Sequence, residues 1–386
     1  MPRRDFLAGA GAAAVVGTLG GCALDARQRP AASRLILPPL RVAPDRISDI
    51  TVCTRPFRAA GPRLDVERRD EKTVIHHYGH GGSGWSLSWG WGHEAMKLAL
   101  ATGERDVAVI GCGAIGLTTA VLLARTGARV AIYARDLPPF TRSSWATGLF
   151  TPDSRVALAE YATPGFKSAW NERARYSYRM YESFLGLADQ PVEFVDFYSV
   201  ESGRRKREVA KSDESRPPFA QLEGELLADL EPRGRTYSAG THNLGDYELS
   251  RWTPYMFNLS AYTRLLMADF RSAGGTIEVM EFTSPAEFAR LAQKTIVHCT
   301  GYGARALLND ESVIPVRGQL ARTPPQEGIR YGLAYQDSMF IPRRDGFVFQ
   351  VLGNDDYYGY GIDSVAPDRA EAEHAVQTMQ SLFPLA

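Results

Sequence analysis

The sequence predicts an α/β protein of two domains. Its 386 residues exceed one average domain, at roughly 150 residues per domain. Between residues 106 and 136, a short apolar run leads into a glycine-rich turn, a run of helical spacing and a second short apolar run. This strand–helix–strand order is the repeating unit of parallel sheets covered by helices.

The composition excludes charged macromolecules as partners. Lys plus Arg and Asp plus Glu both number 44, so the chain has no net field that would attract nucleic acid or an acidic surface. A hydrophobic content of 44% and a charged content of 23% are those of an ordinary globular chain. We therefore expect a small-molecule partner and no nucleic acid.

The first 48 residues predict export. The basic start "MPRRDF" is followed by the weakly apolar run "LAGAGAAAVVGTLGG" and by Cys22. This run is too short for a membrane-spanning helix, which needs about 20 apolar residues. Residues 1–21 resemble a twin-arginine export signal with a lipoprotein-type cleavage site, the alternative being a disordered tag with chance arginines. We expect a periplasmic or membrane-anchored lipoprotein, with a lipid anchor at Cys22 and a tether over residues 22–48. The alternative for the stretch "RLILPPL" within this tether is that it packs on the body of the protein.

The sequence gives no sign of a metal site or a disulfide framework. Cys53, Cys112 and Cys299 are widely spaced and form no C-x-x-C pattern. The three histidines of "HHYGH", residues 76–80, have no paired carboxylate or cysteine nearby in the sequence. We expect no metal.

The clearest motif is "DVAVIGCGAIGLTTAVLLARTGARVAIYARD", Asp106 to Asp136. Gly111, Gly113 and Gly116 give the GxGxxG pattern between two apolar strands, and Ile115 lies in the same turn. The first glycine permits the tight turn, the second admits a pyrophosphate and the third permits close helix packing. The helix N-terminus then offers N–H groups to the phosphates, so this unit predicts dinucleotide binding.

The second strand leaves the identity of the dinucleotide open. An acid usually meets the ribose hydroxyls at its end, but here Arg135 occupies that end and Asp136 follows. An arginine there would suit the 2′-phosphate of NADP. Because no second nucleotide-binding unit for a hydride acceptor is visible, a single tightly held FAD fits better.

A second glycine-rich segment, "VIHHYGHGGSGWSLSWG", precedes this motif. We expect a strand at residues 73–78, a loop at 79–84 and a helix that closes at Gly103 and leads into the dinucleotide strand. A glycine-rich loop at a helix N-terminus lets backbone N–H groups approach an electron-rich edge, and the flavin ring has such an edge.

Four separated motifs resemble the D-amino-acid oxidase family of FAD flavoproteins. They are the βαβ unit with its continuation "LPPFTRSSWATGLFTP", then "TIVHCTGYGARAL", "PVRGQL" and "HHYGHGGSGWSLSWG". The resemblance implies a Rossmann-like FAD-binding domain and a second α+β substrate domain on a mixed or antiparallel sheet. We assign residues 65–160 and 261–316 to the FAD-binding domain, and residues 49–64, 161–260 and 317–386 to the substrate domain.

The order of the motifs departs from the family. There the "HxYGHGGxG" loop and the arginine ahead of it lie near the C-terminus, whereas here both precede the first βαβ unit. The chain is therefore interpreted as a circular permutation. Since permutation is tolerated where termini lie close in space, we expect residues 383–386 to lie beside the segment before Ile50.

The resemblance also assigns residues to the cofactor. It places one stretch along the isoalloxazine ring, with the Ser86 hydroxyl reaching the O2 side: Gly81, Gly82, Ser83, Gly84, Trp85 and Ser86. It places a second group around the pyrophosphate, the ring and the adenine: Ser143, Ser144, Gly148, Leu149, Val297, Cys299, Thr300 and Gly301. A helix dipole at the ring would stabilise the negative charge that builds on reduction.

The resemblance places Arg55, Gly82, Tyr335 and Met339 at the substrate. Arg55 matches the arginine that holds the substrate carboxylate, for which a planar guanidinium is suited. Two tyrosines spaced by four close over the substrate in the family; Tyr335 matches the first, but Met339 replaces the second. The missing phenol puts substrate affinity or identity in doubt, and Met339 would soften an apolar pocket or lie in the core.

These observations together predict an exported FAD enzyme that oxidises the Cα–N bond of a small D-amino acid, with oxygen or a membrane electron carrier as acceptor. No acid–base residue is needed if the amine arrives neutral. Two alternatives remain. One is a secondary-amine (glycine- or sarcosine-type) oxidase or dehydrogenase, and the other is a flavin-bound lipoprotein that binds an amino acid without turnover.

Overall fold

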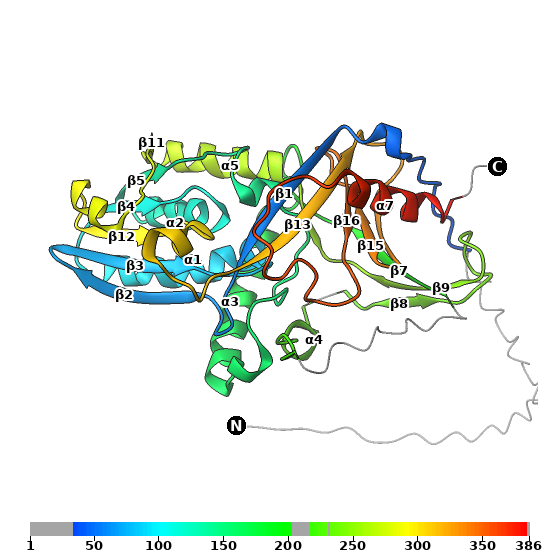
Figure 1. Cartoon of the computed structure of the whole chain (residues 1–386), viewed down its shortest axis with the longest axis horizontal. Helices are drawn as coiled ribbons and strands as arrows, with labels where there is room; N and C mark the ends of the chain where they lie inside the picture. The colour runs from blue at the N-terminus through cyan, green and yellow to red at the C-terminus, as the bar shows by residue number, and fades with distance from the viewer. Residues whose placement is uncertain (1–33, 203–215, 231, 384–386) are drawn as a thin grey trace, which may run out of the picture.

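A computed structural model of the chain describes residues 34–202, 216–230 and 232–383. Two sheets dominate the structure (Figure 1). The smaller sheet and its helices occupy one half of the molecule and the larger sheet the other. Strands β1 and β13 of the larger sheet lie near the middle of the molecule, between the two halves. The predicted export signal, residues 1–21, and Cys22 lie outside the described residues.

The smaller sheet has the parallel topology that the βαβ unit predicts. Its six strands in spatial order are β11 (Thr276–Val279), β5 (Arg129–Ala134), β4 (Asp106–Ile110), β12 (Thr295–His298), β3 (Lys72–Tyr78) and β2 (Arg63–Arg69). The first five are parallel, and β2 pairs with β3 antiparallel at the edge. Strand β12 thus lies between the strand of the glycine-rich loop and the strand of the GxGxxG turn.

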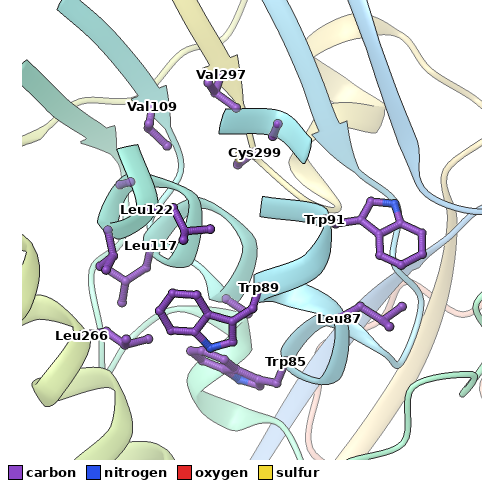
Figure 2. Packing of buried hydrophobic residues seen from close by; sticks show 14 of the residues in the cluster. Trp85, Leu87, Trp89, Trp91, Val109, Leu117, Leu122, Leu266, Val297 and Cys299 are labelled. Atoms are coloured by element: carbon purple, nitrogen blue, oxygen red, sulfur yellow. The ribbon is translucent and has the colours of Figure 1, made fainter. Parts of the chain in front are cut away.

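Four long helices pack around this sheet. They are α1 (Gly84–Leu100), α2 (Ala114–Arg125), α3 (Pro164–Glu182) and α5 (Leu259–Ser272). Helix α1 is buried on nearly every side, with Trp85, Trp89 and Trp91 all in the core around it (Figure 2). A helix that is apolar all round belongs inside a protein, and α1 accordingly lies between α2 and α3.

The larger sheet is mixed, as expected for the second domain. Its eight strands in spatial order are β1 (Asp49–Phe57), β13 (Ile314–Thr323), β16 (Phe347–Val351), β15 (Ser338–Ile341), β14 (Tyr331–Tyr335), β7 (Asp196–Ser202), β9 (Tyr247–Trp252) and β8 (Arg235–Tyr237). All neighbours are antiparallel except β14 and β7. Helix α7 (Arg369–Gln380) packs on one face.

Shorter elements complete the fold. They are strands β6 (Val192–Phe194) and β10 (Tyr255–Phe257), which pair with each other, and helices α4 (Glu223–Leu226) and α6 (Gly303–Leu308). Four 3₁₀ turns are also described, at Pro44–Arg46, Arg142–Trp145, Ala159–Tyr161 and Pro285–Arg290.

Three of the predicted domain boundaries fall inside helices or strands of the structure. The 64/65 boundary lies inside β2, and the 316/317 boundary lies inside β13. The 260/261 boundary lies in the first turn of α5. Helix α3, which the prediction assigned to the substrate domain, packs against α1 of the FAD-binding half.

The two described ends of the chain lie together, as predicted for a permuted chain. Leu37 and Leu40 are buried in the same apolar cluster as Met379 and Phe383, and the Arg369 guanidinium donates to the Pro44 carbonyl at 3.0 Å. In the described part of the predicted tether, the alternative holds: Leu37, Leu40 and Val42 are buried in the apolar cluster of the larger sheet and α7. Among the described residues, no helix is both long and apolar enough to cross a membrane.

Candidate active site

A cavity of about 730 Å³ opens beyond the carboxyl ends of β3, β4, β5 and β12 and reaches the last residues of β1. Ligands of open parallel sheets bind at this edge. Both glycine-rich segments line the same cavity, Gly82 from one and Gly113 from the other. The two segments can therefore contact one bound cofactor, as the resemblance implies. A cavity of this size is large enough for a dinucleotide.

The GxGxxG turn has the geometry of a phosphate cradle. Gly111 has φ +108°, and a Cβ there would lie 2.5 Å from the Cys299 carbonyl oxygen. A Cβ on Gly116 would lie 2.0 Å from the Gly111 carbonyl oxygen, so this glycine serves helix packing and does not line the cavity. Gly113 caps α2 without a side-chain hydrogen bond. The Ala114 N–H donates to Ser143 Oγ at 3.0 Å, so the N–H groups of Ile115 and Gly116 are those that the first turn offers to an anion.

The far end of the cavity disfavours a 2′-phosphate. Arg135 Nε donates to Asp136 at 2.9 Å, and its Nη1 donates to Glu281 at 3.2 Å. Two carboxylates therefore already neutralise this arginine. Arg142, which sequence reasoning missed, also lines the cavity with its guanidinium 5.1 Å from the centre of the Tyr302 ring. Its position in "FTRSSW", beside the predicted phosphate segment, was the available signal.

The loop of residues 79–84 is clamped by its own backbone. Gly79 and Gly81 have positive φ values of +89° and +55°. Gly81 N–H donates to the Pro56 carbonyl at 2.8 Å, Gly82 N–H to the Ser154 carbonyl at 2.9 Å and Ser83 N–H to the His80 carbonyl at 2.9 Å. The N–H groups left for a ligand are therefore those of the first turn of α1, not those of Gly81 and Gly82.

The serines of this loop are used inside the protein. Ser86 Oγ accepts from the Thr151 N–H at 2.8 Å, and Ser83 Oγ donates to the Ser154 carbonyl at 3.1 Å. Neither side chain lines the cavity, so the predicted role of the Ser86 hydroxyl at the flavin O2 side is corrected. The physical reason is that both hydroxyls hold the segment 151–154 against the helix start.

The predicted cofactor residues divide into those that line the cavity and those that do not. Those that line the cavity are Gly81, Gly82, Gly84, Trp85, Gly111, Gly113, Ile115, Arg135, Asp136, Ser143, Thr300 and Gly301. Those that do not are Gly116, Ser83, Ser86, Ser144, Gly148, Leu149 and Val297. Val297 is in the core beneath the turn, and Ser144 bonds to Thr141 at 2.9 Å, so both support the cavity from behind.

Arg55 lies at the substrate end of the cavity. It is on β1, and its guanidinium lies over Gly318 of β13, where a Cβ would come within 2.6 Å of Nη2. No carboxylate of the described chain forms an ion pair with it. An arginine without a partner at the end of a ligand cavity is suited to a carboxylate ligand.

The structure separates Tyr335 from Met339. Ala334 pairs with Met339 across β14 and β15, and both contact the apolar cluster that includes Leu149 and Leu320. Tyr335 points to the opposite face, where its hydroxyl lies 3.0 Å from that of Tyr247. The prediction that Tyr335 orients the substrate carboxylate is corrected, because neighbouring strand residues alternate between faces.

A hydrogen-bonded chain runs from the edge of the sheet to the cavity. Thr300 Oγ1 lies 2.7 Å from His298 Nε2, the Nδ1 atoms of His298 and His76 are 3.2 Å apart, and His76 Nε2 lies 2.8 Å from Glu67. Burial lowers the pKa of both imidazoles, that of His298 to about 3. With both rings neutral, the Thr300 hydroxyl donates to His298 Nε2, His298 Nδ1–H donates to His76 Nδ1, and His76 Nε2–H donates to the Glu67 carboxylate. This direction of donation fixes the tautomer of each ring.

His77 at the end of β3 and His80 in the loop line the cavity, and both side chains are buried and neutral. Burial and the charge of Arg173 lower the pKa of His80 to about 3, and neither ring nitrogen of His80 has a hydrogen-bond partner in the described chain. Burial also lowers the pKa of His77, followed by the charges of His80 and Arg173. Over the described residues, no group of three His, Cys, Asp or Glu side chains is placed to hold a metal ion.

The fold and the cavity define a class: a two-domain dinucleotide-dependent oxidoreductase. Residues 106–386 match the family described as FAD dependent oxidoreductase. The chain is 33% identical over 292 residues to a D-amino-acid oxidase of Streptomyces coelicolor, covering 73% of this chain and 79% of the relative. It is 28% identical over 289 residues to a D-amino-acid oxidase of Rubrobacter xylanophilus, covering 72% and 76%.

A solved structure supports the fold. Iminodiacetate oxidase from Chelativorans sp. BNC1 superposes with a TM-score of 0.50 at 17% identity, over 72% of this chain and 79% of that one. The chain belongs to the FAD-dependent oxidoreductase family, within which D-amino-acid oxidases are among its relatives. It is an enzyme, and its cofactor is FAD. The glycine cradle, the free helix N-termini and the neutralised Arg135 all fit that dinucleotide.

Proposed function

We propose that this enzyme oxidises the Cα–N bond of D-amino acids, with oxygen as the electron acceptor. The observation that carries the proposal is Arg55, a cation that has no ion-pair partner among the described residues and lines the cavity beside the glycine-rich loop. The names of the two bacterial relatives, both D-amino-acid oxidases, support the same substrate class.

The chain's own residues act by positioning. Arg55 binds the α-carboxylate, and the first turn of α1 presents its N–H groups and positive dipole end to the ring. When bound, FAD supplies the oxidant that takes a hydride from the substrate Cα. The proposal requires no side chain to take a proton from the amine if the amine enters neutral, so orientation by Arg55 carries the rate.

Anaerobic mixing with a panel of substrates tests this function. We expect D-amino acids to bleach the flavin absorbance and L-amino acids not to, and we expect peroxide to form when oxygen is readmitted. Bleaching only by N-alkyl glycines would instead identify a secondary-amine oxidase. A spectral shift without bleaching would identify a binding protein without turnover. If the reduced flavin passes its electrons to an added redox dye but forms no peroxide with oxygen, the electron acceptor is a carrier and not oxygen.

We also propose that the gene encodes a circular permutation of the family fold. The support is that β3 and its loop precede β4 in the chain, that residues 106–386 match the family and that the two ends lie together. A variant that begins at Asp106 and joins Ala386 to residues 34–105 through a short linker restores the family order and keeps the buried Leu37 and Leu40. We expect it to fold and bind FAD. A soluble variant that binds no FAD would count against the proposal.

Export is a further part of the proposed function, motivated by "MPRRDF" and by Cys22. We expect the protein in the periplasmic or membrane fraction of its host, and Arg3→Lys combined with Arg4→Lys should retain it in the cytoplasm. Cys22→Ala should release it from membranes while leaving FAD content unchanged. Cytoplasmic localisation of the unaltered chain would refute the export proposal.

A further inference from the structure

The hydrogen-bonded chain that ends at Thr300 has a direction, and its first member sets it. The chain begins at Glu67 on the edge strand β2 and passes through His76 on β3 and His298 on β12. It ends at Thr300, which lines the cavity. A carboxylate only accepts hydrogen bonds, whereas a neutral imidazole has one donor and one acceptor nitrogen. The ionised end therefore decides which nitrogen of each ring carries the proton.

Arg69 helps to keep Glu67 in its accepting form. Arg69 Nη2 lies 2.7 Å from one carboxylate oxygen of Glu67, and His76 Nε2 lies 2.8 Å from the other. Burial opposes ionisation of Glu67, but the hydrogen bond from His76 and the charge of Arg69 outweigh it, so the pKa of Glu67 is lowered. Its side chain is 34% exposed, so the chain connects the protein surface with the cavity.

The two buried rings transmit this direction without freedom to reverse it. Both histidines are fully buried and neutral, because burial lowers their pKa values. Since His76 donates to Glu67 from Nε2, its Nδ1 can only accept, and His298 must donate from Nδ1. Reversing one ring alone would bring two N–H groups or two lone pairs face to face in the core, where an unmade hydrogen bond is costly.

The Thr300 hydroxyl is therefore an acceptor toward the cavity. Its one hydrogen is used by His298 at 2.7 Å, and within the described residues Thr300 Oγ1 forms no other hydrogen bond. The oxygen can accept a further hydrogen bond but cannot donate one. A phosphate oxygen, which also only accepts, is unsuited as its partner, and a ligand hydroxyl is suited.

The place of β12 in the sheet selects the hydroxyl. Strand β12 lies between β4, whose turn forms the phosphate cradle, and β3, which leads to the glycine-rich loop and α1 (Figure 1). Thr300 is close to the cradle, because a Cβ on Gly111 would lie 3.4 Å from the Thr300 nitrogen. In FAD, the segment that joins the pyrophosphate to the ring is the ribityl chain, which carries hydroxyl groups.

We propose that Glu67, acting through His76 and His298, sets the Thr300 hydroxyl as a hydrogen-bond acceptor for a ribityl hydroxyl of FAD. Glu67 is thus a positioning residue for the cofactor, although it lies at the outer edge of the sheet. The inference concerns cofactor binding and does not depend on the substrate proposed above.

Nitrogen-15 NMR of the imidazole groups tests the direction of the chain. In the unaltered protein we expect His76 to be protonated at Nε2 and His298 at Nδ1, with His76→Asn and His298→Asn assigning the signals. Glu67→Lys replaces an acceptor by a donor and should reverse both tautomers, whereas Glu67→Gln can still accept and should keep them. Protonation of His298 at Nε2 in the unaltered protein, or unchanged tautomers in Glu67→Lys, would overturn the inference. The first of these outcomes requires no variant to fold.

Titration of the FAD-free protein with FAD, followed by flavin fluorescence, measures the effect on the cofactor. Glu67→Lys should weaken FAD binding by about threefold to tenfold, as for the loss of one neutral hydrogen bond. Glu67→Gln should change it by less than about twofold. Glu278→Lys is the matched control, because Glu278 is exposed on β11 at the other edge of the same sheet. Equal weakening by Glu67→Lys and Glu278→Lys would reveal a general effect of charge and overturn the inference.

FAD analogues that each lack one ribityl hydroxyl identify the donor. We expect one of the 2′-deoxy, 3′-deoxy and 4′-deoxy forms to bind the unaltered protein more weakly than FAD does. Thr300→Val should weaken the binding of FAD but not that of this analogue, because the hydrogen bond is already absent. If Thr300→Val weakens the binding of FAD and of all these analogues by the same factor, the inference is overturned. These are binding measurements, so their outcome is independent of whether D-amino acids are oxidised.

Discussion

Arg55 carries the first prediction at the scale of single residues. Arg55→Met keeps the length and apolar stem of the side chain and removes the fork that binds the carboxylate. Losing one partner of a desolvated charge pair costs about 2 to 5 kcal/mol, so kcat/KM should fall by roughly 30-fold to several thousand-fold. Stopped-flow flavin reduction against substrate concentration measures the change. Arg129→Met is the matched control, because Arg129 is 77% exposed at the opposite end of the sheet.

FAD content provides the check on that experiment. Arg55→Met should bind FAD as the unaltered enzyme does, since the phosphate cradle is formed by other residues. Kinetics equal to those of Arg129→Met would show that the carboxylate is bound elsewhere in the cavity.

The same scale shows where sequence reasoning stopped. Arg55 could be chosen from its place before Pro56, because motif and chain position both mark it. The prediction for Tyr335 was wrong because a spacing of four residues between Tyr335 and Met339, across two strands and a turn, does not determine which face of the sheet each side chain lies on. The register of β14 and β15 decides that, pairing Met339 with Ala334 and leaving Tyr335 with Tyr247.

At the scale of elements, the loop between β3 and α1 carries the second prediction. Gly81 and Gly103 both have positive φ, +55° and +82°, but only Gly81 is crowded. Gly103→Ala should cost about 1 to 2 kcal/mol, from the left-handed conformation alone. Gly81→Ala should cost clearly more, because its Cβ would overlap the Arg155 carbonyl. It should also weaken FAD binding, since relief of the overlap moves the loop.

Denaturant unfolding of the FAD-free protein and fluorescence titration with FAD measure the two effects. Comparing Gly81→Ala with Gly103→Ala separates the effect of crowding from that of backbone strain, because both variants place an alanine at a positive φ. Equal stability and equal FAD affinity of the two variants would contradict the close packing of this loop.

Elements were the most predictable part of the fold. The strand expected at residues 73–78 is β3, Lys72–Tyr78, and the helix expected after Gly84 is α1, Gly84–Leu100. Apolar periodicity and glycine at the turns carry this information locally. The sequence could not show which N–H groups of the loop were free, because those bonds depend on Pro56 and Ser154, which are distant in the chain.

At the scale of the whole molecule, the chain ends were predictable and their contacts were not. The motif order alone implied that the ends lie together. Burial of Leu37 and Leu40 against Phe383 had no periodic signal in a segment rich in Pro and Arg. Short apolar stretches between prolines are read as linkers unless the surface that covers them is known.

Stability should depend on pH through buried histidines on both sides of the sheet. Burial lowers the pKa of His80 and of His298 from 6.5 to about 3. Between pH 3 and pH 6.5, each of these histidines is protonated in the unfolded chain and neutral in the folded chain. Their contribution to stability is therefore complete above about pH 6.5 and is lost as pH falls toward 3, by up to about 1.4 kcal/mol per pH unit for each histidine.

Urea unfolding of the FAD-free protein at a series of pH values between 7.5 and 4.5 measures this dependence. His80→Asn and His298→Asn should each reduce the slope of the unfolding free energy against pH by up to about 1.4 kcal/mol per pH unit. The double variant should reduce the slope by up to twice that. Carboxylates also titrate in this range, but they are common to all variants, so the difference in slope reports the imidazoles. A slope unchanged in both variants would mean that water or a proton reaches these rings in the folded protein, which contradicts their burial behind the cofactor loop.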